Sequence, residues 1–146
     1  MTSLYFDSTY LCKLHWPEAG AADVMACAAG ADESVVALHG EAEFYSAGHR
    51  KLREGSTSAA TLSTVFAQFQ ADYAGGGIRF LQLTEAIIHR VFEVYSSASA
   101  QTYLRAADAI HLATAAEHGF AEIYSNDGHL LAAAPLLGLR GVNVIP

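Results

Sequence analysis

Residues 104–130, which read LRAADAIHLATAAEHGFAEIYSNDGHL, carry the features that best predict the fold of this chain. The first part has the apolar spacing of a helix, and the short apolar run EIYS (122–125) that follows favours a buried strand. Ser-Asn-Asp-Gly then signals a turn into a second helix, DGHLLAAAP. A helix, a strand and a helix in succession are typical of an α/β domain with a parallel sheet.

One carboxylate, Asp108, lies in the middle of this apolar helix. An unpaired carboxylate in such surroundings costs several kcal/mol, so we expect Asp108 to be paired, hydrogen-bonded, neutralised or bound to a cation. Arg105, three residues earlier, is one possible partner, but an exposed pair of this kind contributes less than about 1 kcal/mol. The apolar neighbours therefore favour a stronger form of compensation than a surface ion pair.

The remaining sequence continues the alternation of strands and helices. Apolar runs predict strands at SLYF (3–6), SVVAL (34–38), IRFLQL (78–83), EIYS (122–125) and GVNVI (141–145). Helical spacing predicts helices at 8–15, 17–30, 40–55, 56–73, 84–96, 104–119 and 127–135. The triple glycine at 75–77 leads from a helix into a strand, the reverse of a phosphate-binding loop, and predicts a turn. We expect one α/β domain over residues 1–146, with a central, mainly parallel sheet flanked by helices.

The composition indicates a folded, non-membrane protein. With 146 residues, of which 52% are hydrophobic, the chain can bury one core and is too apolar to be disordered. No apolar run approaches the roughly 20 residues of a membrane-spanning helix, and the N-terminus lacks a signal-peptide pattern, so we expect a cytoplasmic protein. Cys12 and Cys27 form no C-x-x-C pair and are predicted to be buried free thiols.

Two acids follow predicted strands at the point where each strand ends. Asp7 comes directly after SLYF and Asp127 directly after EIYS, and parallel sheets bind ligands at the carboxyl ends of their strands. Asp108 could return over the same edge, and Glu41 or Glu43 could come from the helix after SVVAL. Each acid has an ordinary alternative: the aspartates could be helix caps or turn residues, and the glutamates solvated helix acids.

Their shared position at one sheet edge favours a cation site. Carboxylates held together repel one another and cannot all stay ionised at neutral pH without a cation. Several hard oxygen ligands favour Mg²⁺ or Mn²⁺, which activates water and neutralises charge on a phosphoryl group. The net charge of −7 argues against a general nucleic-acid coat but permits an enzyme that acts on phosphodiesters.

Three segments resemble the PIN domain family. DSTYLCKLHWPEAG (7–20) resembles the opening of PIN domains, and VVALHGEAEFYSAGHRK (35–51) resembles their second segment, which carries one key Glu. Residues 104–130 resemble the D-A-x-H-x-A-T-A helix and the strand after it. The motifs are most similar to those of VapC toxins from bacterial toxin–antitoxin pairs. The resemblance implies a small α/β domain, Mg²⁺-dependent endoribonuclease activity, a homodimer and a cognate antitoxin.

By motif position, the resemblance implies that Asp7, Glu43, Asp108 and Asp127 are the catalytic acids. The three aspartates would hold Mg²⁺ or Mn²⁺, and Glu43 would be a further ligand or would orient the attacking water. Glu43 is preferred to Glu41 because E-F-Y-S-A-G-H-R matches the family's Glu-x-x-Ser-Ala run. In-line attack on RNA would leave a 5′-phosphate.

Other polar residues would support these acids or the substrate. Ser8 and Ser125 match family hydroxyls next to the first and last acid and would support them by hydrogen bonds. Lys13 and Arg50 could contact RNA phosphates, although a solvated helix end is an equally good interpretation of Arg50. His111, one turn after Asp108, is interpreted as a packed or supporting residue, and no histidine pair has zinc-ligand spacing.

Rival functions stay open at this stage. A phosphohydrolase usually has Asp-x-Asp after its first strand, where this chain has Asp7-Ser8-Thr9, and a receiver domain needs a late lysine, but none follows Lys51. A non-catalytic PIN-like scaffold would use the same acids only as caps. A PIN nuclease of RNA processing would act without an antitoxin.

Overall fold

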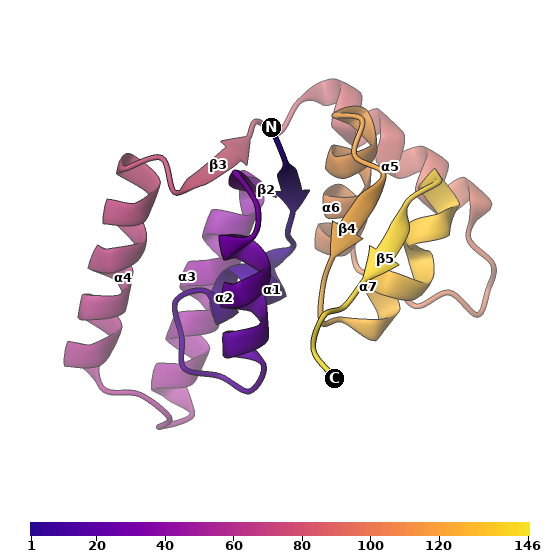
Figure 1. Ribbon diagram of the computed structural model, residues 1–146. Helices are drawn as coiled ribbons and strands as arrows, with labels where there is room; N and C mark the ends of the chain where they lie inside the picture. Colours follow the sequence, from indigo (N-terminus) through magenta and orange to yellow (C-terminus); the bar gives the residue numbers. More distant parts are fainter.

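Parallel strands form the centre of the fold in the computed structural model, which describes residues 1–146 (Figure 1). One sheet has the order β1-β2-β3 and a second pairs β4 with β5, and every pairing is parallel. A bridge between Phe6 and Tyr124 joins the two sheets. The strands are β1 (Ser3–Tyr5), β2 (Glu33–Ala37), β3 (Ile78–Leu81), β4 (Glu122–Tyr124) and β5 (Arg140–Val142).

Helices cover both faces of this arrangement (Figure 1). They are α1 (Ser8–Lys13), α2 (Ala21–Ala29), α3 (His39–Arg53), α4 (Ala59–Ala74), α5 (Glu85–Ser97), α6 (Ala106–Glu117) and α7 (Gly128–Ala133), followed by a 3-10 turn at Ala134–Leu137. The predicted α/β class with a parallel sheet is confirmed. No helix combines the length and apolarity needed to cross a membrane.

The strands divide the hydrophobic core into two parts. Successive strand residues point to opposite faces, so Tyr5 and Val35 pack with α6 and α7, while Phe6 and Val36 pack with α1 to α4. Fully burying side chains of this size contributes about 1.5–3 kcal/mol each. The sheet is therefore held on both faces, which fixes the strand ends from which the candidate site residues project.

Several element boundaries differ from the predictions. The second helix begins at Ala21 and not at Pro17, because Gly20 takes a positive φ of 82° and a Cβ there would lie 2.7 Å from the Ile145 side chain. The last strand covers residues 140–142 and not 141–145. The triple glycine forms the predicted turn, with Gly76 at a φ of 80°. Both cysteines are free, Cys12 buried and Cys27 only half-buried.

Candidate metal-binding active site

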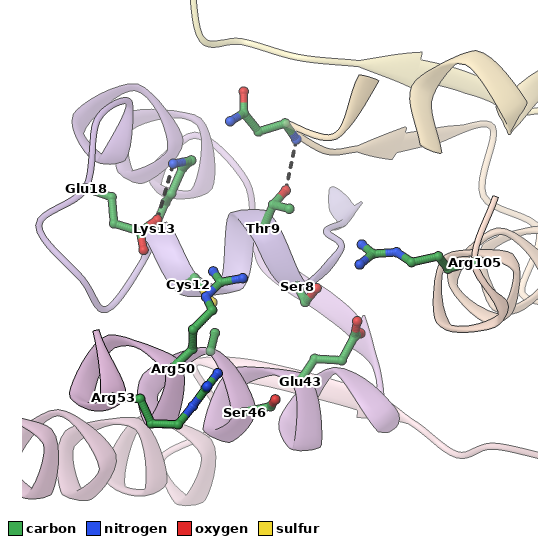
Figure 2. A pocket seen from close by; sticks show the side chains of 12 residues that line it. Ser8, Thr9, Cys12, Lys13, Glu18, Glu43, Ser46, Arg50, Arg53 and Arg105 are labelled. Atoms are coloured by element: carbon green, nitrogen blue, oxygen red, sulfur yellow. Dashed lines mark hydrogen bonds and ion pairs between the residues drawn. The ribbon is translucent and has the colours of Figure 1, made fainter. Parts of the chain in front are cut away.

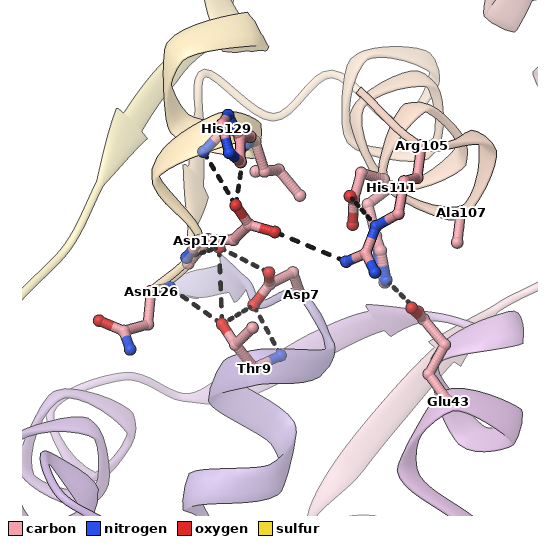
Figure 3. Close-up of polar contacts among 12 residues, drawn as sticks. Asp7, Thr9, Glu43, Arg105, Ala107, His111, Asn126, Asp127 and His129 are labelled. Carbon is pink, nitrogen blue, oxygen red and sulfur yellow. Dashed lines mark hydrogen bonds and ion pairs between the residues drawn. The ribbon is translucent and has the colours of Figure 1, made fainter. Parts of the chain in front are cut away.

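Four carboxylates gather near the carboxyl ends of the central strands, each brought there by a different element. Asp7 follows β1, Asp127 follows β4, Asp108 lies in the first turn of α6 and Glu43 lies early in α3. The three aspartates are linked by hydrogen bonds and ion pairs through one buried hydroxyl and one guanidinium, and Glu43 faces the same space (Figure 3). Residues distant in sequence therefore form one polar site.

Asp7 is a helix cap and a buried carboxylate at once. Its Oδ1 accepts hydrogen bonds from the Thr9 and Tyr10 N–H groups, at 3.0 and 3.2 Å, and from the Thr9 hydroxyl at 2.6 Å. The side chain is almost fully buried. Burial raises the pKa of Asp7, and the field of His111 and the hydroxyls of Ser125 and Thr9 only partly oppose that rise. A cation would therefore stabilise the ionised form.

Ser125 joins the first aspartate to the last. Its hydroxyl donates to Asp7 Oδ2 at 2.6 Å and accepts the Asp127 N–H at 2.9 Å. Asp127 caps α7, since its Oδ1 accepts the N–H groups of His129 and Leu130 at 2.8 and 3.4 Å. The cap leaves Asp127 Oδ2 pointing toward α6 (Figure 3).

Arg105 lies between the other two aspartates. Its Nε is 3.4 Å from Asp108 Oδ2 and its Nη2 is 3.8 Å from Asp127 Oδ2. Burial raises the pKa of Asp108, an effect that Arg105 opposes and the charge of Asp127 reinforces. The predicted ion pair between Arg105 and Asp108 is thus present. The burial of Asp108 and the nearby negative charge of Asp127 are nevertheless features that favour a bound cation.

Glu43 is held by a histidine from α6. His111 Nε2 lies 2.6 Å from Glu43 Oε1, and His111 Nδ1 lies 2.9 Å from the Tyr5 hydroxyl. Because an ionised carboxylate only accepts, the Nε2 must carry a proton and donate to Glu43. Burial alone would raise the pKa of Glu43, but His111, together with His39 and the Ser8 hydroxyl, outweighs burial, and the net pKa is lowered. Glu43 is therefore ionised at neutral pH.

His39 lies beside Glu43 and His111, and one potential metal-ligand atom of each residue lies within 4.8 Å of the other two. His39 Nε2 donates to the Ala107 carbonyl at 2.9 Å, so its lone pair is not free for a metal. Moving the proton to the buried Nδ1, which has no partner, would bury an unpaired N–H. The two histidines therefore flank Glu43: His111 donates a hydrogen bond to its carboxylate, and His39 Nε2 lies 3.4 Å from its Oε1.

The three aspartates fit a hard divalent ion better. They offer only carboxylate oxygens, the donors that Mg²⁺ and Mn²⁺ prefer. Burial raises the pKa of Asp7 and Asp108, and a guanidinium already occupies the position of a counter-charge between Asp108 and Asp127. The carboxylate oxygens of the three aspartates lie farther apart than the ligand atoms of His39, Glu43 and His111. Without a cation, the repulsion between the carboxylates opposes their closer approach.

A groove of about 410 Å³ opens beside these acids (Figure 2). Its walls carry the basic side chains of Arg50 and Arg53 from α3 and of Arg105, the residue before α6, together with Glu43. The groove combines positive charge, which suits a phosphate backbone, with the carboxylate of Glu43, and its Arg105 also contacts Asp108 and Asp127.

The predicted supporting residues take different positions. Ser8 lines the groove, and its hydroxyl contributes to lowering the pKa of Glu43. Lys13 also lines the groove, but its ammonium already bonds to Glu18 Oε1 at 3.2 Å and to the Ala19 carbonyl at 2.8 Å. That pairing favours a structural role for Lys13, whereas Arg50 has no ion pair of this kind.

Sequence reasoning did not identify Thr9 or His39 as residues of the site, and it considered Arg105 only as an ion-pair partner of Asp108. Thr9 bonds to Asp7 and accepts the Asn126 N–H at 2.9 Å, and His39 and Arg105 contact the acids as described. Arg53, three residues after Arg50, also lines the groove. The spacing of His39 and Glu43, one turn apart on one helix, was an available signal. Of the two glutamates considered, Glu43 lines the groove, whereas Glu41 accepts a hydrogen bond from Tyr45 at 3.1 Å.

An α/β fold whose parallel strands bring several acids to one edge belongs to the class of domains that bind their ligands at the carboxyl ends of the strands. The PIN domain model matches residues 5–135, and the chain belongs to the PIN domain family. A search of curated protein sequences gives no match.

Solved structures share this fold at low sequence identity. Mycobacterium tuberculosis VapC20, described as a Sarcin-Ricin loop cleaving toxin, has a TM-score of 0.68 and 15% identity, over 94% of this chain and 98% of that one. FitAcB from Neisseria gonorrhoeae has a TM-score of 0.75 and 16% identity, over 97% of both chains. FitAB bound to an IR36 DNA fragment has a TM-score of 0.75 and 14% identity, over 98% of this chain and 96% of that one.

Proposed function

We propose that this protein is a Mg²⁺- or Mn²⁺-dependent endoribonuclease and the toxin of a toxin–antitoxin pair, acting in the cytoplasm. The observation that carries the proposal is the meeting of Asp7, Asp108 and Asp127 beside a groove lined with arginines. Membership of the PIN family and the folds shared with VapC20 and FitAB support it.

Asp7, Asp108 and Asp127 would hold the ion. When bound, the ion supplies Lewis acidity and neutralises the charge that develops on the phosphoryl group. Ser125 fixes the orientation of Asp7 relative to Asp127, so the carboxylates are positioned before the ion arrives.

Glu43 would act on the attacking water. It is kept ionised and oriented by His111, and its carboxylate faces the groove near Ser8 (Figure 2). It can therefore orient a water molecule or accept its proton. The water oxygen would bond to phosphorus, the bond from phosphorus to the 3′ oxygen would break, and the products would be a 3′-hydroxyl and a 5′-phosphate. Arg50 and Arg53 would hold neighbouring phosphates.

We also propose that the protein forms a homodimer and binds a cognate antitoxin, and exposed apolar side chains support these contacts. Ile88, Phe92 and Tyr95 on α5 are 44%, 75% and 45% exposed, and Tyr103 after that helix is 61% exposed. Apolar residues clustered in this way on a monomer mark interaction surfaces. The only tryptophan, Trp16, is buried in the core and is not part of this exposed set.

The decisive substitution is Asp108→Asn. Asparagine keeps the shape of the side chain but removes the charge, so we expect RNA cleavage with Mg²⁺ to fall by roughly 100-fold or more while the fold persists. The assay is cleavage of total RNA with Mg²⁺ and with EDTA, followed by mapping of the 5′-phosphate ends. Glu117→Gln, a carboxyl-to-amide change at the exposed end of the same helix, is the matched control and should keep its activity.

Full activity in the Asp108→Asn protein would contradict the proposal. A scaffold without catalysis would show no Mn²⁺ affinity that depends on Asp7 and Asp108, so a Mn²⁺ titration of the Asp7→Asn and Asp108→Asn variants separates the two functions. A PIN nuclease of RNA processing would cleave RNA in the same assay but would have no antitoxin that inhibits it.

A further inference from the structure

Arg105 lies at the junction of the acidic site and the basic groove. It contacts Asp108 and Asp127 at 3.4 and 3.8 Å, and it also lines the groove across from Arg50 and Arg53 (Figure 2). One guanidinium is therefore within reach of two acids proposed to hold the ion and of the channel proposed to hold RNA.

The two acids are largely buried, whereas the arginine side chain is exposed to solvent. The Asp108 and Asp127 side chains are 8% and 19% exposed, and the cap hydrogen bonds of α7 hold Asp127 in place. The Arg105 side chain is 68% exposed, and its backbone is extended, with φ −86° and ψ 157°, just before α6 begins. An arriving ion would therefore displace the arginine rather than rearrange the carboxylates.

The charges determine which partner Arg105 takes. A divalent ion that binds the carboxylate oxygens directly competes with the guanidinium for the same two side chains, and ion pairs of an exposed arginine are weak. Once released, the planar guanidinium has the geometry to donate two parallel hydrogen bonds to a phosphate. The groove places it where a phosphodiester backbone would pass.

We propose that Arg105 is a built-in counter-ion of the metal-free site, which a divalent ion displaces and which then binds an RNA phosphate. The inference rests on the proposed nuclease function and adds a coupling between its two ligands. Metal binding makes the arginine available to RNA, and the bound RNA in turn keeps the arginine away from the metal ligands.

The test uses Arg105→Gln and the matched control Arg50→Gln, which removes a second arginine of the same groove that has no ion pair with the acids. Mn²⁺ affinity is measured by calorimetry or electron paramagnetic resonance, without RNA. We expect the Arg105→Gln protein to bind Mn²⁺ about two- to five-fold more tightly than the native protein, because no guanidinium has to be displaced. The Arg50→Gln protein should match the native protein.

RNA affinity is then measured with a labelled single-stranded RNA by fluorescence anisotropy, with and without Mn²⁺, and the length of the RNA is checked afterwards. With Mn²⁺, Arg105→Gln should weaken binding and lower the log–log salt slope by about 0.7, the value for one phosphate contact with a single strand. Without Mn²⁺ it should change little, whereas Arg50→Gln should weaken binding in both conditions. Arg105→Lys, which keeps the charge without the planar fork, should keep the native Mn²⁺ affinity.

Three results would overturn the inference. Equal Mn²⁺ affinity in the native and Arg105→Gln proteins would show that no counter-ion is displaced. An equal loss of RNA affinity with and without Mn²⁺ would make Arg105 a fixed groove contact. In either case the proposed nuclease function stands, provided that the native protein binds Mn²⁺ and cleaves RNA. If the native protein binds no Mn²⁺ and cleaves no RNA, both the inference and the proposed function fail.

Discussion

The hydroxyl of Ser125 offers the sharpest test of how the site is held together. It is fully buried, donates to Asp7 Oδ2 at 2.6 Å and accepts the Asp127 N–H at 2.9 Å. The substitution Ser125→Ala removes one oxygen and leaves both partners without this bond. Alanine fits the same space, so the effect reports mainly on the two hydrogen bonds.

The expected loss follows from the charge of one partner. A hydrogen bond to a charged group contributes about 1.5–3 kcal/mol, and the unpaired N–H of Asp127 adds up to about 1 kcal/mol. We therefore expect Ser125→Ala to lower the free energy of unfolding by about 2–4 kcal/mol, as measured by urea denaturation of the metal-free protein near neutral pH. If Asp7 is a metal ligand, Mn²⁺ affinity should also fall by about 10- to 100-fold.

Ser3→Ala is the matched control. The Ser3 hydroxyl also donates to a carboxylate at 2.6 Å, but the acceptor, Glu33, keeps two bonds from Arg79 and lies nearer the surface. We expect this variant to lose less than about 1 kcal/mol. If Ser125→Ala cost no more than Ser3→Ala, the buried hydroxyl would not be what holds the two acids together.

Two further predictions concern the scaffold around the site. Arg79 donates to both carboxylate oxygens of Glu33, at 3.0 and 2.8 Å, and with the Ser3 hydroxyl it holds the pKa of Glu33 at about 2. At pH values above the ordinary Glu pKa, Arg79→Gln should therefore lower the free energy of unfolding by about 0.5–1 kcal/mol. The difference from the native protein should disappear as the pH falls toward about 2. A difference in thermal unfolding that did not shrink on acidification would contradict this prediction. In Gly48→Ala, the new Cβ would lie 2.7 Å from a ring carbon of Phe66 on α4. Overpacking costs about 1–3 kcal/mol, against the roughly 1 kcal/mol that alanine gains over glycine in a helix. We therefore expect a lower free energy of unfolding in urea denaturation, and a higher one would refute the contact.

Local patterns were enough to predict the class of the fold. Alternating apolar runs and helical spacing gave the order of strands and helices, because both depend on neighbouring residues. The positions of Asp7 and Asp127 after strands were predictable for the same reason, since strand ends in a parallel sheet share an edge. Element ends were less predictable: α2 begins late because Gly20 takes a positive φ, at a position where a Cβ would meet the side chain of the distant Ile145.

Apart from the one-turn spacing of His39 and Glu43 on α3, the contacts that tune the acids could not be predicted from spacing. His39 donates to the Ala107 carbonyl, and His111 donates to Glu43, each across 68 positions of sequence. Arg105 was visible as a neighbour of Asp108, but its approach to Asp127 depends on how α6 packs beside β4 and α7. These interactions arise from tertiary packing, which a single sequence does not encode in a local motif.

The bridge between the two sheets has a consequence for the protein during its own synthesis. Asp7 is translated 118 residues before its partner Ser125, and β4 must dock at Phe6 before the two meet. A nascent chain whose β4 is still inside the ribosome thus lacks a complete site. If the protein is a ribonuclease, it cannot attack RNA until β4 has left the ribosome and has docked beside β1.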